Sequence, residues 1–155
     1  MRLFLLRPLL VLVVLVSLIG CASNAKVRNI AVQLVAVKAT STSNGGAQLA
    51  LSIRYFNENL VPIATSGGRH RLTLGDVTLP RIESEEPIGL PQLGSDTQDV
   101  TVTVDAGTVA RLRALQSAGT VSYQLDSTLL IEAGDDDLES RTGASGSVSL
   151  AELGL

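Results

Sequence analysis

The chain has 155 residues, 45% of them hydrophobic and 3% aromatic, and its formal net charge is -3 at pH 7. This length suits one domain with a core of its own rather than two. The acidic balance argues against nucleic acid and anionic headgroups as electrostatic partners, and the scarcity of aromatic residues argues against a stacking surface for carbohydrate or bases.

Residues 1–20 have the three parts of a secretory signal peptide. Arg2 and Arg7 give the basic start, an apolar run extends to Ile19, and a small residue precedes Cys21. A transmembrane anchor is the alternative, but the apolar run falls short of the roughly 20 residues that span a bilayer. We expect the leader to be removed. The remaining 135 residues then carry 10 of the 12 basic side chains and all 15 acidic ones, a net charge of -5.

The leader ends in Leu18, Ile19, Gly20 and Cys21, and Cys21 is the only cysteine. This ending resembles the lipobox of bacterial lipoproteins. The resemblance implies that a thioether lipid is attached to Cys21, that the chain is cleaved before it, and that the new amino end is acylated, as with palmitate. Two or more acyl chains hold a protein on a bilayer where one alone is marginal. The alternative is a free, buried cysteine.

The residues after Cys21 indicate in which bacterial membrane the protein is anchored. Ala22 and Ser23 follow it, so the chain lacks the aspartate that retains bacterial lipoproteins in the inner membrane. By this resemblance we expect a protein anchored in the outer membrane and facing the periplasm unless it is flipped outward, with the inner membrane as the less favoured location. Residues 21–26 form the lipidated tether.

The first half of the mature chain has the pattern of β-strands. Residues 27–39 are β-branched and apolar on both faces, which is typical of a strand buried from two sides. Residues 40–46 are polar and predict a turn. Residues 47–57 alternate with period two, as a half-buried strand does. After a break at 66–68, the Gly-Asp pair within residues 72–79 predicts a tight hairpin.

The second half continues this pattern with one interruption. Three prolines within 80–91 predict an irregular stretch, and the valines of 100–104 predict another strand. Asp105 or Thr108 can cap one short helix, which Gly119 ends. A long strand at 121–133 and a closing strand at Val148 and Leu150 follow. We therefore predict an all-β fold, an antiparallel seven-stranded sandwich of the immunoglobulin or fibronectin kind with one short helix.

The order of these motifs resembles the type 2 late embryogenesis abundant (LEA) domain, also called the water stress and hypersensitive response domain. The likeness covers most of residues 27–150 and leaves a short C-terminal tail at 151–155. The residues that carry it are Asn57, Asn59, Pro62 and Ile63 after the second strand, Leu90, Pro91, Gly94 and Ser95 before the valine strand, Tyr123 in the long strand, and Gly146 near the end.

Two residues depart from the family pattern. Glu58 replaces a proline of the signature, so the turn after the second strand loses a fixed φ angle. Ser127 stands where the family has glycine, so we expect a change in any bulge or close backbone approach at that point.

The resemblance implies a non-catalytic role in protection against drying, osmotic or other envelope stress, through the shielding of proteins or membrane. The alternative is a structural or binding module of a cell-envelope complex that shares the fold without a stress role. The expected partners are the membrane, through the lipid on Cys21, and envelope proteins or stress-exposed client proteins. The oligomeric state is left open.

Nothing in the sequence predicts an enzyme or a cofactor. His70 is the only histidine, no Gly-x-Ser-x-Gly elbow occurs, and too few donors exist for a zinc site. Because Arg69 and Arg71 flank His70, we interpret it as a solvated strand residue. The acidic run Asp135 to Asp137, with Glu139, is interpreted as a hydrated turn, and a weak calcium site is the alternative.

Overall fold

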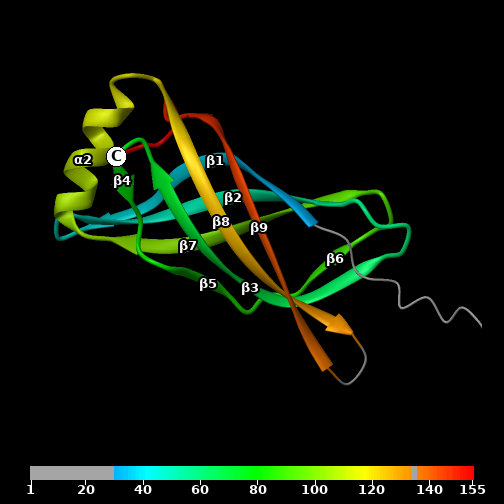
Figure 1. The fold of residues 1–155 in the computed structure, drawn as a ribbon. Coiled ribbons are helices and arrows are strands. Elements are labelled where there is room, and N and C mark those ends of the chain that lie inside the picture. Colours follow the sequence, from blue (N-terminus) through cyan, green and yellow to red (C-terminus); the bar gives the residue numbers. More distant parts are fainter. Residues whose placement is uncertain (1–29, 134–135) are drawn as a thin grey trace, which may run out of the picture.

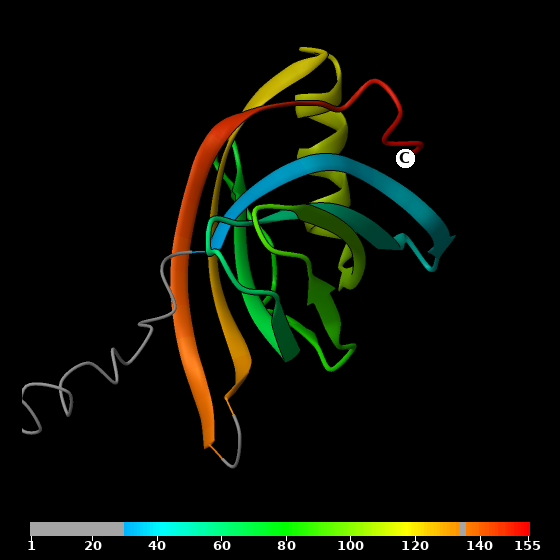
Figure 2. The same cartoon turned by 90° about the vertical axis from the view of Figure 1, so that its right-hand side faces the viewer.

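The computed structural model describes residues 30–133 and 136–155, and all structural statements refer to these. Two antiparallel sheets pack face to face with one helix at an end of the sandwich (Figures 1 and 2). This confirms the all-β sandwich fold. The lipobox residues Leu18, Ile19, Gly20 and Cys21 lie outside the described residues.

The smaller sheet has three strands in the order β1-β2-β7, namely β1 (Ile30–Ser43), β2 (Gly46–Asn57) and β7 (Ser95–Val104). The larger sheet has the order β4-β3-β8-β9, and two further strands pair with β3. Its members are β3 (Ile63–Leu74), β4 (Val77–Thr78), β5 (Ile82–Ser84), β6 (Ile88–Leu90), β8 (Thr120–Ala133) and β9 (Asp136–Ser149). The helix α2 (Ala106–Gln116) connects β7 to β8.

The described part holds nine strands, and seven of them correspond to the predicted ones. The two additional strands, β5 and β6, come from the proline-rich stretch expected to be irregular. They have three residues each, and both pair with β3. Pro80, Pro87 and Pro91 flank these two strands and limit each to a short segment, because proline cannot donate to a ladder.

Four strands are longer than predicted, among them β7, which begins at Ser95 rather than at residue 100. The β1–β2 turn uses only Asn44 and Gly45, both with positive φ, so β1 extends through residues 40–43. The break expected at 66–68 is a register shift inside β3, where an added side chain at Gly67 would strike the backbone carbonyl of Ser84. The strand β9 pairs with β8 along its whole length, from Asp136 opposite Ala133 to Ser149 opposite Thr120.

The core lies between the two sheets. Leu49, Leu51 and Ile53 of β2 are fully buried, as are Leu72 of β3 and Leu125 of β8. Complete burial of side chains of this size stabilises a fold by about 1.5–3 kcal/mol each. The hydrophobic effect therefore supplies the main stabilisation of this sandwich.

The helix and the C-terminal residues close one end of the core. The Asp105 side chain caps α2 by accepting a hydrogen bond from the amide of Thr108 at 2.7 Å, and the helix buries Leu112. Leu153 is also fully buried, and its carbonyl accepts a hydrogen bond from the Ala39 amide. Among the described residues, no helix combines the length and the apolar composition needed to cross a membrane.

Candidate functional site

A chain of three buried polar side chains joins the two sheets. Tyr55 comes from β2 in the small sheet, whereas His70 and Ser127 lie opposite each other on β3 and β8 of the large sheet. The His70 Nδ1 atom lies 2.9 Å from Ser127 Oγ, and its Nε2 atom lies 3.4 Å from the Tyr55 hydroxyl. The histidine is only 2% exposed. Both ring nitrogens thus have partners within the core.

The surroundings of His70 keep the ring neutral. Burial lowers the pKa of His70 to about 4, and burial also raises the pKa of Tyr55. A neutral imidazole has one donor and one acceptor nitrogen. The two hydrogen bonds therefore run in the same direction through the three side chains, either from Tyr55 to Ser127 or from Ser127 to Tyr55. The arrangement suits a structural link between the sheets.

The interpretation of His70 as a solvated strand residue is wrong. The flanking arginines point outward, but His70 shares strand parity with Leu72 and Leu74, so it faces the core. This parity was the signal in the sequence that His70 is buried.

Ser127 supplies a partner for the buried ring, which gives a physical reason for a serine where the resembled family has glycine. No register shift interrupts either strand pairing of β8 at Ser127.

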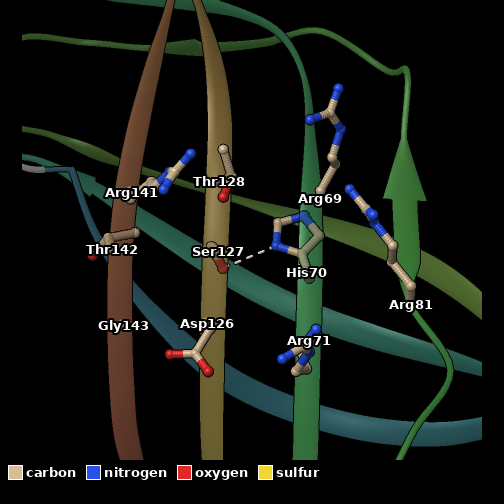
Figure 3. A pocket seen from close by; sticks show the side chains of 10 residues that line it. All are labelled: Arg69, His70, Arg71, Arg81, Asp126, Ser127, Thr128, Arg141, Thr142 and Gly143. Carbon is tan, nitrogen blue, oxygen red and sulfur yellow. Dashed lines mark hydrogen bonds between the residues drawn. The ribbon is translucent and has the colours of Figure 1, made fainter.

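A shallow depression of about 540 Å³ lies on the outer face of the large sheet, where His70 and Ser127 contribute to its floor (Figure 3). Its residues come from β3, β8, β9 and the segment before β5. They are Arg69, His70, Arg71, Arg81, Asp126, Ser127, Thr128, Arg141, Thr142 and Gly143. Four of the ten are arginines, which makes the depression a candidate site for an anionic group.

The arginines of the depression form only exposed ion pairs. Glu139 lies 3.6 Å from Arg69 and 3.2 Å from Arg141, and Glu83 lies 3.1 Å from Arg81. Exposed pairs of this kind contribute about 0–1 kcal/mol, so an incoming anion can replace them at little cost.

The candidate calcium residues are only partly described. Asp135 lies outside the described residues, as do the side chains of Asp136 and Asp137. Glu139 forms ion pairs with two arginines of the depression, Arg69 and Arg141. Among the described residues there is no group of three or more metal-ligating side chains. The interpretation as a hydrated turn therefore stays a prediction, with a weak calcium site as its alternative.

The residues of the Asn-x-Asn signature form a second polar cluster, at the end where β2 stops. The Asn57 side-chain amide donates hydrogen bonds to the carbonyls of Val61 at 2.8 Å, Leu90 at 3.2 Å and Pro91 at 3.0 Å. Its carbonyl oxygen accepts hydrogen bonds from the backbone and side-chain amides of Asn59, both at 2.9 Å. One buried side chain thus connects two loops.

The other signature residues surround this cluster. Ile63 opens β3 and is buried, whereas Pro62 and Glu58 are exposed in the loop before it. Asn57 and Asn59 are both buried. The loop is therefore held by hydrogen bonds to Asn57, although Glu58 stands in place of a proline.

Tyr123 and Gly146 form a matched pair on β8 and β9. They lie opposite each other in the register, and an added Cβ at Gly146 would lie 3.0 Å from the Tyr123 ring. The Tyr123 hydroxyl also accepts a hydrogen bond from the Leu34 amide at 3.3 Å. Glycine thus leaves space for a ring that reaches across to β1.

We predict that His70 makes the protein less stable in acid. The folded-state pKa of about 4 lies below the unfolded value of 6.5, so the unfolded state binds more protons as pH falls between these values. The free energy of unfolding should drop by up to about 3 kcal/mol between pH 6.5 and pH 4 through this group. Urea unfolding across this range measures the loss, with His70→Gln as the non-titrating control. Equal pH slopes for both proteins would contradict the prediction.

Neither the family models nor the curated proteins give a match to this chain. Solved structures do. The solution structure of AT1g01470 from Arabidopsis thaliana is 12% identical with a TM-score of 0.53, covering 85% of this chain and 89% of its own. A structure described as a late embryogenesis abundant protein, At2g46140.1, is 16% identical with a TM-score of 0.44, covering 83% and 75%. A protein from Archaeoglobus fulgidus is 15% identical with a TM-score of 0.43, covering 76% and 97%. The AT1g01470 likeness shows a shared fold.

Proposed function

We propose that this chain is a lipoprotein of the outer membrane that faces the periplasm and protects the cell envelope under desiccation or osmotic stress without catalysis. The observation that carries the proposal is the position at which the chain enters the sandwich. Ile30 opens β1 and pairs with Asn57, and β1 begins at the end of the sandwich remote from α2 (Figure 1). The nine residues from Cys21 to Ile30 span at most about 30 Å. A lipid on Cys21 would keep this end close to the bilayer.

The chemistry of the core supports a non-catalytic role. A hydrolytic triad in this chain would need His70 as its base, because no other histidine exists. His70 is buried, its ring nitrogens face Tyr55 and Ser127, and burial lowers its pKa to about 4. A base of this kind has neither access to a substrate nor the basicity that general-base catalysis near neutral pH requires.

The outer surface supports shielding of neighbouring molecules. The edge strand β7 exposes Thr97, Asp99, Thr101 and Thr103, while the valines between them face the core. Hydroxyl and carboxylate groups hold water, and charge on an edge strand opposes pairing with other chains. A domain with such a surface, tethered densely to a membrane, would keep partly dried proteins apart. The protective role itself rests on the resemblance to the type 2 LEA domain.

Deletion of the gene and complementation test this function. We expect deletion to lower survival after drying or osmotic shock, the full chain to restore it, and a Cys21→Ser chain to fail because it lacks the anchor. Mass spectrometry of the native protein should find lipid on Cys21. Full rescue by Cys21→Ser, an intact leader, or normal survival of the deletion strain would contradict the proposal.

The depression with four arginines favours a second candidate, a binding module for an acidic segment of another envelope protein. Arg71 has no ion-pair partner among the described residues, and its neighbours Arg69 and Arg141 are held only by an exposed glutamate. Charge complementarity of this kind selects partners and speeds their encounter.

Crosslinking in intact cells tests the second candidate. A double variant, Arg71→Glu with Arg141→Glu, should lose the captured partner by about tenfold or more, because like charges placed face to face cost several kcal/mol. The matched control is Arg111→Glu, which reverses an exposed charge on α2 away from the depression. Equal loss in both proteins, or capture unchanged in the double variant, would contradict a site at the depression.

A further inference from the structure

Three exposed apolar side chains gather at the end of the sandwich where β1 begins. Leu60 is 78% exposed and Val61 is 48% exposed in the loop between β2 and β3, and Leu93 is 65% exposed in the loop between β6 and β7. We name these three residues the apolar tip. Exposed leucines in two adjoining loops lose the stabilisation that burial would give them.

The two loops of the apolar tip are joined to each other. The Leu93 amide donates a hydrogen bond to the Asn59 carbonyl at 3.1 Å, and the Asn57 amide donates one to the Gly94 carbonyl at 2.8 Å. The Asn57 side chain adds bonds to both loops, at Val61 and at Pro91. The tip is therefore a fixed surface, presented by the fold.

The backbone at Leu93 is strained as well as exposed. Its φ angle is +49°, in the left-handed region that costs a residue with a Cβ about 1–2 kcal/mol. Glycine or asparagine would relieve this strain, and a polar residue would suit the exposure. Leucine at this position satisfies neither local preference. Strain and apolar exposure at the same residue point to a contact outside the chain.

We propose that the apolar tip inserts into the surface of the bilayer that carries the lipid anchor; this rests on the function proposed above. Residue 30 lies opposite Asn57, so the chain enters the domain beside the tip, and the nine residues after Cys21 span at most about 30 Å. A lipid at Cys21 thus brings this end of the sandwich to the membrane.

The charge of the tip indicates which kind of bilayer surface it fits. Glu58 is exposed in the same loop as Leu60, and Asp96 is exposed just beyond Gly94. Two carboxylates beside three apolar side chains disfavour anionic headgroups and favour an uncharged, zwitterionic surface. Contact is then driven by apolar burial at the boundary between headgroups and acyl chains.

The absence of tryptophan from the chain makes a direct test possible. Single Leu60→Trp and Val35→Trp variants of the full lipidated protein are placed in phosphatidylcholine vesicles with brominated acyl chains. Val35 is 42% exposed on β1, outside the tip, so it is the matched control. We expect emission from position 60 to fall about twofold further than that from position 35, because interfacial apolar groups reach roughly 5–10 Å into the bilayer.

A variant of Leu93 separates a membrane role from a structural one. Leu93→Asn in the Leu60→Trp protein relieves the left-handed strain, so the thermal midpoint should not fall, whereas quenching at position 60 should decrease. Loss of quenching without loss of stability supports insertion. Unchanged quenching would overturn the proposal.

The remaining outcomes distinguish the tip from the anchor. Equal quenching at positions 60 and 35 in protein that stays on the vesicles would overturn insertion and leave the anchor intact. A blue-shifted but unquenched emission at position 60 would mean that a second copy or another protein covers the tip, which also overturns insertion. Absence of lipid on Cys21 in the mass spectrum would overturn the proposed function and this inference with it.

Discussion

The side chain of Asn57 is the constraint on which the end of the sandwich where β1 begins depends. Strand pairing ends at this residue, and the two loops beyond it have no ladder of their own to satisfy their backbone groups. One amide bonds to three carbonyls and accepts from two donors on Asn59. A buried asparagine that makes all of these bonds fixes the loops in one arrangement, and the exposed residues Leu60 and Leu93 follow from it.

The same strand that ends at Asn57 also links the sheets. Tyr55 lies two residues earlier on β2 and reaches His70, which contacts Ser127 on β8. No charged side chain takes part in this link, because Arg69, Arg71 and Asp126 lie on the outer face of the large sheet. The neutral polar link inside and the arginine-rich depression outside therefore share β3 and β8, because successive residues of a strand face opposite sides.

Alternation in the sequence predicted β2, β8 and the second half of β7 well, because each has large apolar residues on one face only, whereas Ser95 to Asp99 of β7 carry no such signal. It missed most of β9, whose serines, glycines and alanine carry little hydrophobic signal and which exists as the hairpin partner of β8. The sequence interpretation also placed His70 in solvent because its neighbours are arginines, whereas the alternation of β3 turns its side chain toward the core. The partners of Asn57 could not be predicted, because Leu90 and Pro91 lie more than thirty positions away and meet it only through strand register.

Hydrogen exchange in an Asn57→Ala variant tests most directly whether this one side chain holds the two loops together. Its loss removes the hydrogen bonds to the carbonyls of Val61, Leu90 and Pro91, and the lost bond to the buried Leu90 carbonyl alone costs about 1–3 kcal/mol. The account predicts that the Asn59 and Leu93 amides exchange about tenfold faster or more, while amides in the centre of β8 keep their protection. Unchanged exchange at Asn59 and Leu93, or an equal increase throughout the protein, would contradict it.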